Sequence, residues 1–248
     1  MKTLYKISSL LVVLSLIVGC TSTKSIQKNL NAQAYSMAYL KDSRIAEIKS
    51  GVRVDIDPVL FSPNMLSDTT KVTRDKGWFL PLVVVYIWKS QNTCIQGKSM
   101  FEEDIPTFLR ASLMDEINRS AGFTADTIGG TEYTLELSID ELKTVGSYES
   151  KGFSYFALYA YGYSYADIAG PAISNLTVSY RLKRNGEVVH GNTFISERAT
   201  EQINRRYMDI KTLQYDYATS MVEAVSNNLK TVIELIVKDL NGYFSSNT

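Results

Sequence analysis

The sequence predicts an α+β fold, a mixed, largely antiparallel sheet with two amphipathic helices packed on one face. Short stretches in which apolar and polar residues alternate recur along the chain and are typical of half-buried strands. Two longer stretches repeat apolar residues at three- and four-residue spacing, which is typical of amphipathic helices. The order of these stretches favours a sheet covered by helices on one face.

The first strands are expected just after residue 51. Val52, Val54 and Ile56 alternate with charged residues, which predicts a half-buried strand. Residues 82–88, LVVVYIW, are apolar throughout, and we expect a central strand there that is covered on both faces. Residues 61–76 show no clear period and are expected to form a loop.

A helix is expected from Ile105 to Ile117, preceded by Ser99 and Glu102, which fit a capping box. Residues 133–139 alternate again and predict a further strand.

The last part of the chain reads as a hairpin followed by a helix. Asn185 and Gly186 favour the turn of a β-hairpin, because both residues tolerate a positive φ. Residues 187–196 are the expected partner strand of residues 176–182. A long amphipathic helix is expected over residues 221–240, ended by Asn241 and Gly242.

The amino terminus resembles that of a bacterial lipoprotein. Lys2 and Lys6 precede a short apolar run, and this run is shorter than the roughly 20 residues that cross a bilayer. It ends in IVGC, which resembles a lipobox. The resemblance implies that residues 1–19 are a signal peptide cleaved after Gly19, and that Cys20 is acylated and anchors the protein through lipid in a membrane.

The anchor divides the chain into three parts. Thr21 follows Cys20 in place of an inner-membrane retention Asp, so the resemblance implies the outer membrane with the domain in the periplasm. Residues 20–50 are interpreted as the lipidated cysteine and a flexible tether rich in polar residues. Residues 51–248 are expected to form a single α+β domain.

Composition argues against several classes of function. The 26 basic residues balance the 26 acidic ones, so no nucleic-acid partner is expected. His190 is the only histidine, no Cys/His cluster has zinc spacing, and no phosphate-loop motif occurs, so we expect no metal, no cofactor and no enzyme. No carboxylate is identified that would orient His190. Cys94 is interpreted as a buried thiol.

Residues 152–170, GFSYFALYAYGYSYADIAG, carry the most distinctive pattern. No charge occurs between Lys151 and Asp167, and aromatic residues fall mostly on alternate positions. We interpret the segment as an insertion between two strands. It could be a buried strand or hairpin of the sheet, a ribbon that binds a partner, or a contact with lipid. The candidate contact residues are Phe153, Tyr155, Tyr159, Tyr161, Tyr163 and Tyr165.

The order of elements also resembles a recurring extracytoplasmic domain. The phrases VVVYIW, TEYTLELSIDEL and LTVSYRLKRNGEVVHGNTFIS, followed by a terminal helix, are similar to the auxiliary lipoproteins of ABC-type lipid-transport systems. They are also similar to the amino-terminal domain of the Tol-system β-propeller protein, to lipoprotein activators of peptidoglycan synthases, and to the core of the curli-secretion channel lipoprotein. The resemblance implies docking, bridging or assembly in the envelope.

These observations favour a non-enzymatic, outer-membrane-anchored lipoprotein that acts as an accessory or docking component of an envelope transport or assembly system. Its expected partners are the membrane, through lipid on Cys20, and an envelope protein. One alternative is an oligomeric membrane-active or secretion-channel lipoprotein that uses residues 152–170. A second alternative is an envelope hydrolase with acidic catalysis, for which Asp55 and Glu102 are the carboxylates to test.

Overall fold

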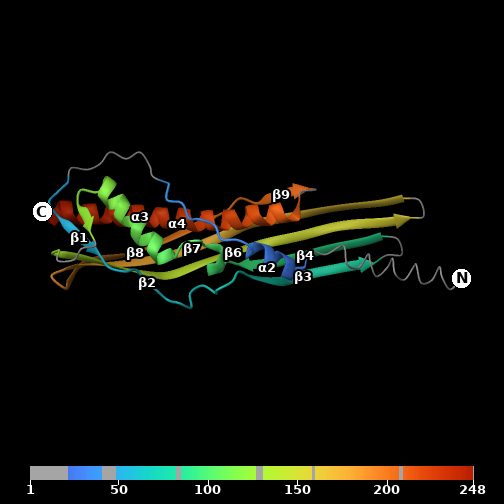
Figure 1. Ribbon diagram of the computed structural model, residues 1–248, viewed down its shortest axis with the longest axis horizontal. Coiled ribbons are helices and arrows are strands. Elements are labelled where there is room, and N and C mark those ends of the chain that lie inside the picture. Colours follow the sequence, from blue (N-terminus) through green and yellow to red (C-terminus); the bar gives the residue numbers. More distant parts are fainter. Residues whose placement is uncertain are drawn as a thin grey trace.

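The computed structural model describes residues 22–40, 49–81, 85–126, 131–157, 160–206 and 209–247. Within these residues, nine strands form one sheet and three α-helices cover one of its faces, so the expected α+β class is confirmed (Figure 1). The strands are β1 Arg53–Ile56, β2 Leu60–Phe61, β3 Lys71–Pro81, β4 Val85–Ile95, β5 Thr124–Asp126, β6 Tyr133–Ala157, β7 Ala160–Arg184, β8 Glu187–Ala199 and β9 Ile203–Arg206. The helices are α2 Thr23–Leu30, the short 3₁₀ helix η1 Lys98–Met100, α3 Ile105–Ser120 and α4 Ile210–Asn247.

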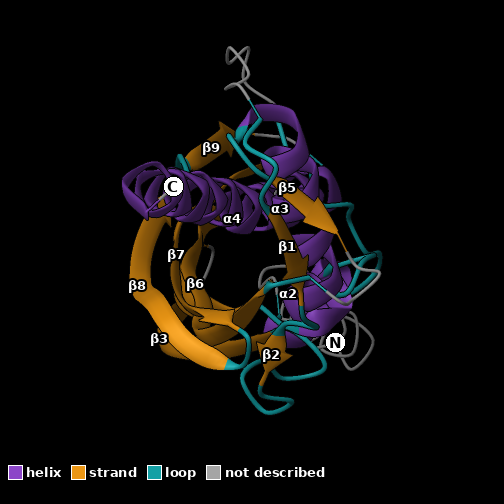
Figure 2. Cartoon of the chain, turned by 90° about the vertical axis from the view of Figure 1, so that its left-hand side faces the viewer, coloured by secondary structure: helices purple, strands orange, loops and turns teal. Residues whose placement is uncertain are grey.

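The sheet is organised around the long strands β6 and β7, which pair with each other antiparallel along their whole length. On its other side β6 pairs with β1 and β2 near its start and with β4 further on. β7 pairs with β9 and then with β8 on its outer side. The sheet is strongly curved, and the helices lie on its concave side (Figure 2).

The core lies between the first half of the long hairpin and α4. Leu135, Leu137 and Ile139 on β6 are buried, and alternate residues on β7, from Leu176 to Leu182, are buried beside them. α4 contributes apolar residues at helical spacing that are almost completely buried: Met221, Val225, Leu229, Val232, Ile236 and Leu240. The period-two and helical patterns in the sequence therefore mark this core correctly.

The expected hairpin between β7 and β8 is confirmed. Asn185 has φ 51° and Gly186 has φ 89°, the two positive values that a tight hairpin turn of this kind requires. The strand that follows the turn begins at Glu187, as expected, and continues to Ala199.

The helices differ from expectation at their ends. α3 begins at Ile105, but its cap is Asp104, whose carboxylate accepts a hydrogen bond from the Thr107 amide, and Ser99 instead donates to Asn31. α4 continues through Gly242 to Asn247. Packing explains this extension, because Phe244 is buried against Phe123 and outweighs the weak helix propensity of glycine.

Two further expectations are wrong within the described residues. The segment interpreted as a tether contains α2, whose Ile26 and Leu30 are completely buried in the core. Two apolar residues four positions apart provide the face that packs the helix onto the domain. Residues 71–76, expected as a loop, belong to β3, where Val72 is the only buried residue. Such a strand lacks an alternating apolar pattern.

Candidate functional site

The long strands continue beyond the part of the sheet that the helices cover. In Figure 1 the β3–β4 and β6–β7 hairpins extend together past α2 and past the start of α4. We call this extension the hairpin end and define it as residues 78–81, 85–88, 152–157 and 160–165. It is a four-stranded ribbon in the order β3-β4-β6-β7. About six residues of β6 at about 3.3 Å each give it a length of ~20 Å.

One face of the hairpin end continues the helix-covered face of the sheet. Tyr161, Tyr163 and Tyr165 follow one another on β7, with ring centroids 5.8 Å and 6.1 Å apart. Phe79 and Tyr86 stack on the same face with their centroids 6.0 Å apart. Tyr161 and Tyr163 are 61% and 56% exposed, so this face carries aromatic rings that no helix covers.

The opposite face of the ribbon is apolar as well. Trp78, Leu80 and Phe153 lie on it and are 53%, 45% and 44% exposed. Tyr155 shares this face and is exposed to a similar extent. A ribbon with exposed aromatic rings on both faces has no core of its own, and exposed apolar area of this kind marks an interaction site.

Two glycines allow aromatic rings to lie flat on the ribbon. A Cβ atom on Gly152 would lie 2.3 Å from the Trp88 ring, and one on Gly162 would lie 2.2 Å from the Tyr155 ring. Both glycines are the direct cross-strand neighbours of these residues. The glycines therefore leave room for the Trp88 and Tyr155 rings to pack closely against the neighbouring strand.

Charged residues resume immediately behind the hairpin end. Lys89 and Lys151 are cross-strand neighbours on the outer face, and both pair with Glu149, at 3.2 Å and 3.1 Å. Hydrogen bonds from Lys151, Lys89 and Gln91 lower the pKa of Glu149, although burial alone would raise it. The strand positions next to the hairpin end hold six basic residues and three acidic ones. The basic residues are Arg74, Lys76, Lys89, Lys151, Arg205 and Arg206, and the acidic residues are Asp75, Glu149 and Asp167. We call this band the basic collar.

A buried hydrogen-bond network joins the hairpin end to the body. The Tyr148 hydroxyl donates to Asp167 at 2.7 Å and accepts from Gln214 of α4 at 3.2 Å. Gln214 in turn accepts from Asn29 of α2 at 2.7 Å. Burial, followed by the neighbouring Asp167, raises the pKa of Tyr148. The network ties β6, β7, α4 and α2 together where the helix cover ends, and so fixes the direction of the ribbon.

The amino-terminal end of α2 faces the hairpin end. Thr23 lies 3.4 Å from the Asn92 side chain, whereas Asn31 donates to the carbonyl of Thr70, just before β3 begins. β3 runs from Thr70 toward the hairpin end, and Asn92 pairs with Arg74, the fourth residue of β3. The start of α2 therefore lies nearer the hairpin end than its last residues do, so α2 runs in the opposite direction to β3. The amino-terminal end of α2 therefore lies on the side of the hairpin end.

The candidate residues from the sequence divide into three groups. Cys20, Gly19 and Tyr159 lie outside the described residues. Phe153 and Tyr155 lie on one face of the hairpin end, and Tyr161, Tyr163 and Tyr165 lie on the other. The interpretation of residues 152–170 as an insertion is wrong, because residues 152–157 are the last six residues of β6 and residues 160–170 belong to the first half of β7.

Sequence reasoning missed half of the ribbon. Trp78, Phe79 and Leu80 were given no role, and residues 82–88 were expected to be covered on both faces. The signal that could have found them is a second charge-free stretch, residues 77–88, which matches the stretch between Lys151 and Asp167.

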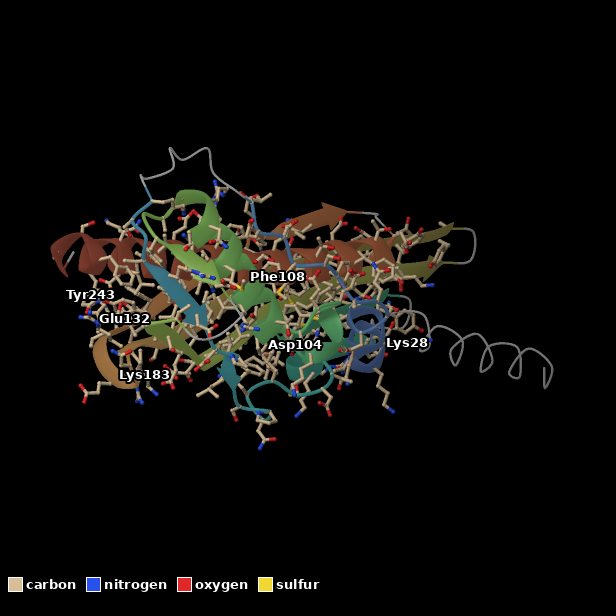
Figure 3. The ribbon with its side chains drawn as sticks, turned by 60° about the vertical axis from the view of Figure 1, so that its left-hand side comes forward. Lys28, Asp104, Phe108, Glu132, Lys183 and Tyr243 are labelled. Atoms are coloured by element: carbon tan, nitrogen blue, oxygen red, sulfur yellow. The ribbon has the colours of Figure 1, made fainter. Side chains whose placement is uncertain are left out.

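The other end of the molecule holds a polar cluster that the sequence did not reveal. Glu132, Lys183 and Tyr243 lie at this end, away from the hairpin end (Figure 3). His190 lies 3.0 Å from Asp239, which also accepts from the Tyr180 hydroxyl, so the expectation that no carboxylate orients His190 is wrong. Burial would raise the pKa of Asp239, but hydrogen bonds from Tyr180, His190 and Asn192 lower it. The cluster links β7 and β8 to α4.

Three further features concern the described residues: metal ligands, a free thiol and the hydropathy of the helices. No group of three or more His, Cys, Asp or Glu residues that could hold a metal ion occurs among the described residues. Cys94 is buried as expected, and burial raises the pKa of its thiol to about 12. None of the described helices is long and apolar enough to cross a membrane.

Comparison with known proteins finds similarity among solved structures alone. No family model matches the chain, and no curated protein matches it. Among solved structures it is similar to the crystal structure of protein XCC0632 from Xanthomonas campestris, a DUF330 protein, with 12% sequence identity and a TM-score of 0.49. The match covers 87% of this chain and 99% of that chain. The resemblances drawn from the sequence remain predictions.

Proposed function

We propose that the protein is a non-enzymatic lipoprotein of the bacterial outer membrane that docks its hairpin end onto another component of the envelope, as an accessory of transport or assembly. The lipid on Cys20 confines the domain to the membrane and raises its effective concentration for whatever it binds. The observation that carries the proposal is the hairpin end itself, a charge-free ribbon with aromatic rings exposed on both faces.

The geometry suits binding. Large aromatic side chains supply contact area at a low cost in conformational entropy, and they dominate the energy of many interfaces. The buried Tyr148 network fixes the direction of the ribbon before any contact forms, which reduces the entropy lost on binding.

Photo-crosslinking in intact cells tests the proposal. A photo-reactive amino acid in place of Tyr161 should give an adduct with an envelope component. The same amino acid in place of Ile195 is the matched control, because Ile195 is 75% exposed on β8, outside the hairpin end. Adducts from position 195 alone, or from neither position, would contradict the proposal.

One observation favours the alternative of an oligomeric membrane-active or secretion-channel component. Within the described residues, the outer edge of β3 pairs with no other strand. Such an edge can pair with another chain. Mass measurement of the detergent-solubilised protein decides, because a monomer would exclude this alternative.

A hydrolytic activity is the remaining alternative. Loss of an envelope activity in Asp55→Asn or Glu102→Gln, with the fold intact, would support it. In the structure Asp55 lies in β1, and Glu102 accepts a hydrogen bond from Ser36.

A further inference from the structure

We propose that the component bound by the hairpin end is the phospholipid bilayer itself, and that the ribbon seats in the interfacial region of one anionic leaflet as a second membrane attachment. The inference rests on the proposed function, because it names the partner of the same surface. Three features of the molecule support a lipid surface over a protein: the distribution of charge, the identity of the side chains, and the side of the domain on which α2 begins.

The ribbon is uncharged at its tip and basic behind it, which matches the apolar interior and the anionic headgroups of a bilayer leaflet. No charged residue lies in the hairpin end, and the residues between its paired strands, 82–84 and 158–159, carry none in the sequence. The basic collar follows directly. Lys89 and Lys151 form the cross-strand pair next to Trp88 and Gly152, where the hairpin end begins. Basic residues at this depth match anionic headgroups, each with a modest electrostatic gain.

The side chains favour the interface over the hydrocarbon interior. Tyrosine and tryptophan prefer the level of the headgroups, where the ring is in an apolar environment and the polar atom remains hydrated. Trp78, Tyr155, Tyr161 and Tyr163 are exposed in this way. The ribbon is also too short to cross, since its ~20 Å compares with ~30 Å of hydrocarbon. The outer edge of β3, which pairs with no other described strand, would be costly in a purely apolar medium.

The position of the anchor brings the ribbon to the membrane. Cys20 and Thr23 are three positions apart in the chain, so Thr23 lies within about 11 Å of the acylated residue. Thr23 lies beside Asn92, and the four residue steps of β4 from Asn92 back to Trp88 advance about 13 Å toward the hairpin end. With Cys20 at the bilayer surface, the hairpin end therefore reaches the same surface.

The two tryptophans provide a direct test. Trp78 and Trp88 are the only ones in the chain, and both lie in the hairpin end. The full lipidated protein is reconstituted in vesicles of three parts phosphatidylethanolamine to one part phosphatidylglycerol. Tryptophan fluorescence is then quenched either by lipids brominated near the headgroup, by lipids brominated near the chain end, or by aqueous iodide.

In a Trp88→Phe background, which leaves the exposed Trp78 as the reporter because Trp88 is buried, we expect strong quenching by bromine near the headgroup, weaker quenching by bromine near the chain end, and protection from iodide. Ile195→Trp in a background of Trp78→Phe and Trp88→Phe is the matched control, and it should respond to iodide alone. Phe153→Asp and Tyr161→Asp change exposed positions, so the fold should survive, as circular dichroism can verify, while the lipid quenching is lost.

Vesicle binding by lysine variants tests the basic collar separately. Lys89→Gln and Lys151→Gln should each weaken the contact with anionic vesicles about fivefold, with little effect on vesicles of phosphatidylcholine alone. Lys183→Gln, at the other end of the molecule, is the control.

Iodide quenching of Trp78 equal to that of the Ile195→Trp control, without quenching by brominated lipid, would overturn the inference. In that case the cellular adducts from position 161 separate the two proposals. An adduct with a protein leaves docking in place and identifies a protein partner, whereas no adduct contradicts docking as well.

Discussion

The two halves of the β6–β7 hairpin have the same backbone structure and opposite surroundings. In the first half, alternate residues such as Leu137 and Leu176 are buried beneath α4. In the second half, the same strands carry aromatic residues that are exposed on both faces. Strand pairing alone therefore does not tell a core from a contact surface. What separates the two halves is the helix cover and the absence of charge.

The largest expected effect compares a side chain from each half. Leu135→Ala should lower the free energy of unfolding by about 2–5 kcal/mol, because Leu135 is completely buried and a cavity would remain. Phe153→Ala should change it by less than about 0.5 kcal/mol, because Phe153 is exposed. Urea denaturation measures both. Equal losses would mean that the hairpin end is part of the core.

The packing of α2 gives the next effect. Ile26→Ala should cost about 2 kcal/mol, since the side chain is completely buried and the helix has only two buried residues. The loss should appear as earlier proteolysis within residues 22–40. Lys28→Ala, on the exposed side of the same helix, serves as the control. If both variants are cleaved like the parent, α2 does not hold this segment to the domain.

The junction between the halves should respond to Tyr148→Phe. The change removes the hydroxyl that donates to Asp167 and accepts from Gln214, which should cost about 1–3 kcal/mol because the remaining groups are buried. Tyr163→Phe removes a hydroxyl from the exposed half and should have almost no effect. Thermal melts of the two variants that coincide would argue against the network.

Alkaline pH should destabilise the covered half through Cys94. Burial raises the pKa of this thiol to about 12, well above the value of about 8.5 in an unfolded chain. The stabilising contribution is therefore complete below pH ~8.5 and is lost as the pH rises toward 12. Between pH 8 and 10, Cys94→Ala should show a smaller fall in unfolding free energy with pH than the parent. The same fall in both would refute the assignment.

Acidic pH should give the smallest effect, through Asp239 at the end opposite the ribbon. Its pKa is lowered in the fold, so its contribution is present above the unfolded value of about 3.9 and is lost as the pH falls through the lower folded value. Asp239→Asn should therefore flatten the decline in stability below pH 4. Urea titrations at pH 5 and below measure this, and an unchanged acid decline would contradict it.

The sequence was most informative where one face of an element is buried. Val54, Leu137, Leu182 and Leu229 fall on the periods that predicted their elements, and Asn185 marked its turn. The sequence failed where packing is not periodic. β3 has one buried residue, Val72, and α4 continues past Gly242 because of a contact distant in sequence.

The candidate site was predicted in part for the same reason. The charge gap in residues 152–170 identified half of the ribbon, but its pairing with β3 and β4 is a long-range property that a local pattern does not encode. Whether a strand is covered by a helix is likewise decided by distant residues, so the apolar run at 82–88 was expected in the core. The cluster around Asp239 joins β7, β8 and α4 and left no local signal.

The central claim is that the hairpin end, and no other part of the surface, makes the contact with the envelope. Hydrogen exchange of the lipidated protein, measured by mass spectrometry in detergent and again in isolated envelope membranes, tests it most directly. The account predicts that the amides of residues 78–88 and 152–165 gain protection in the membranes while those of β8 do not change. Protection gained across β8, or no change at the hairpin end, would contradict it.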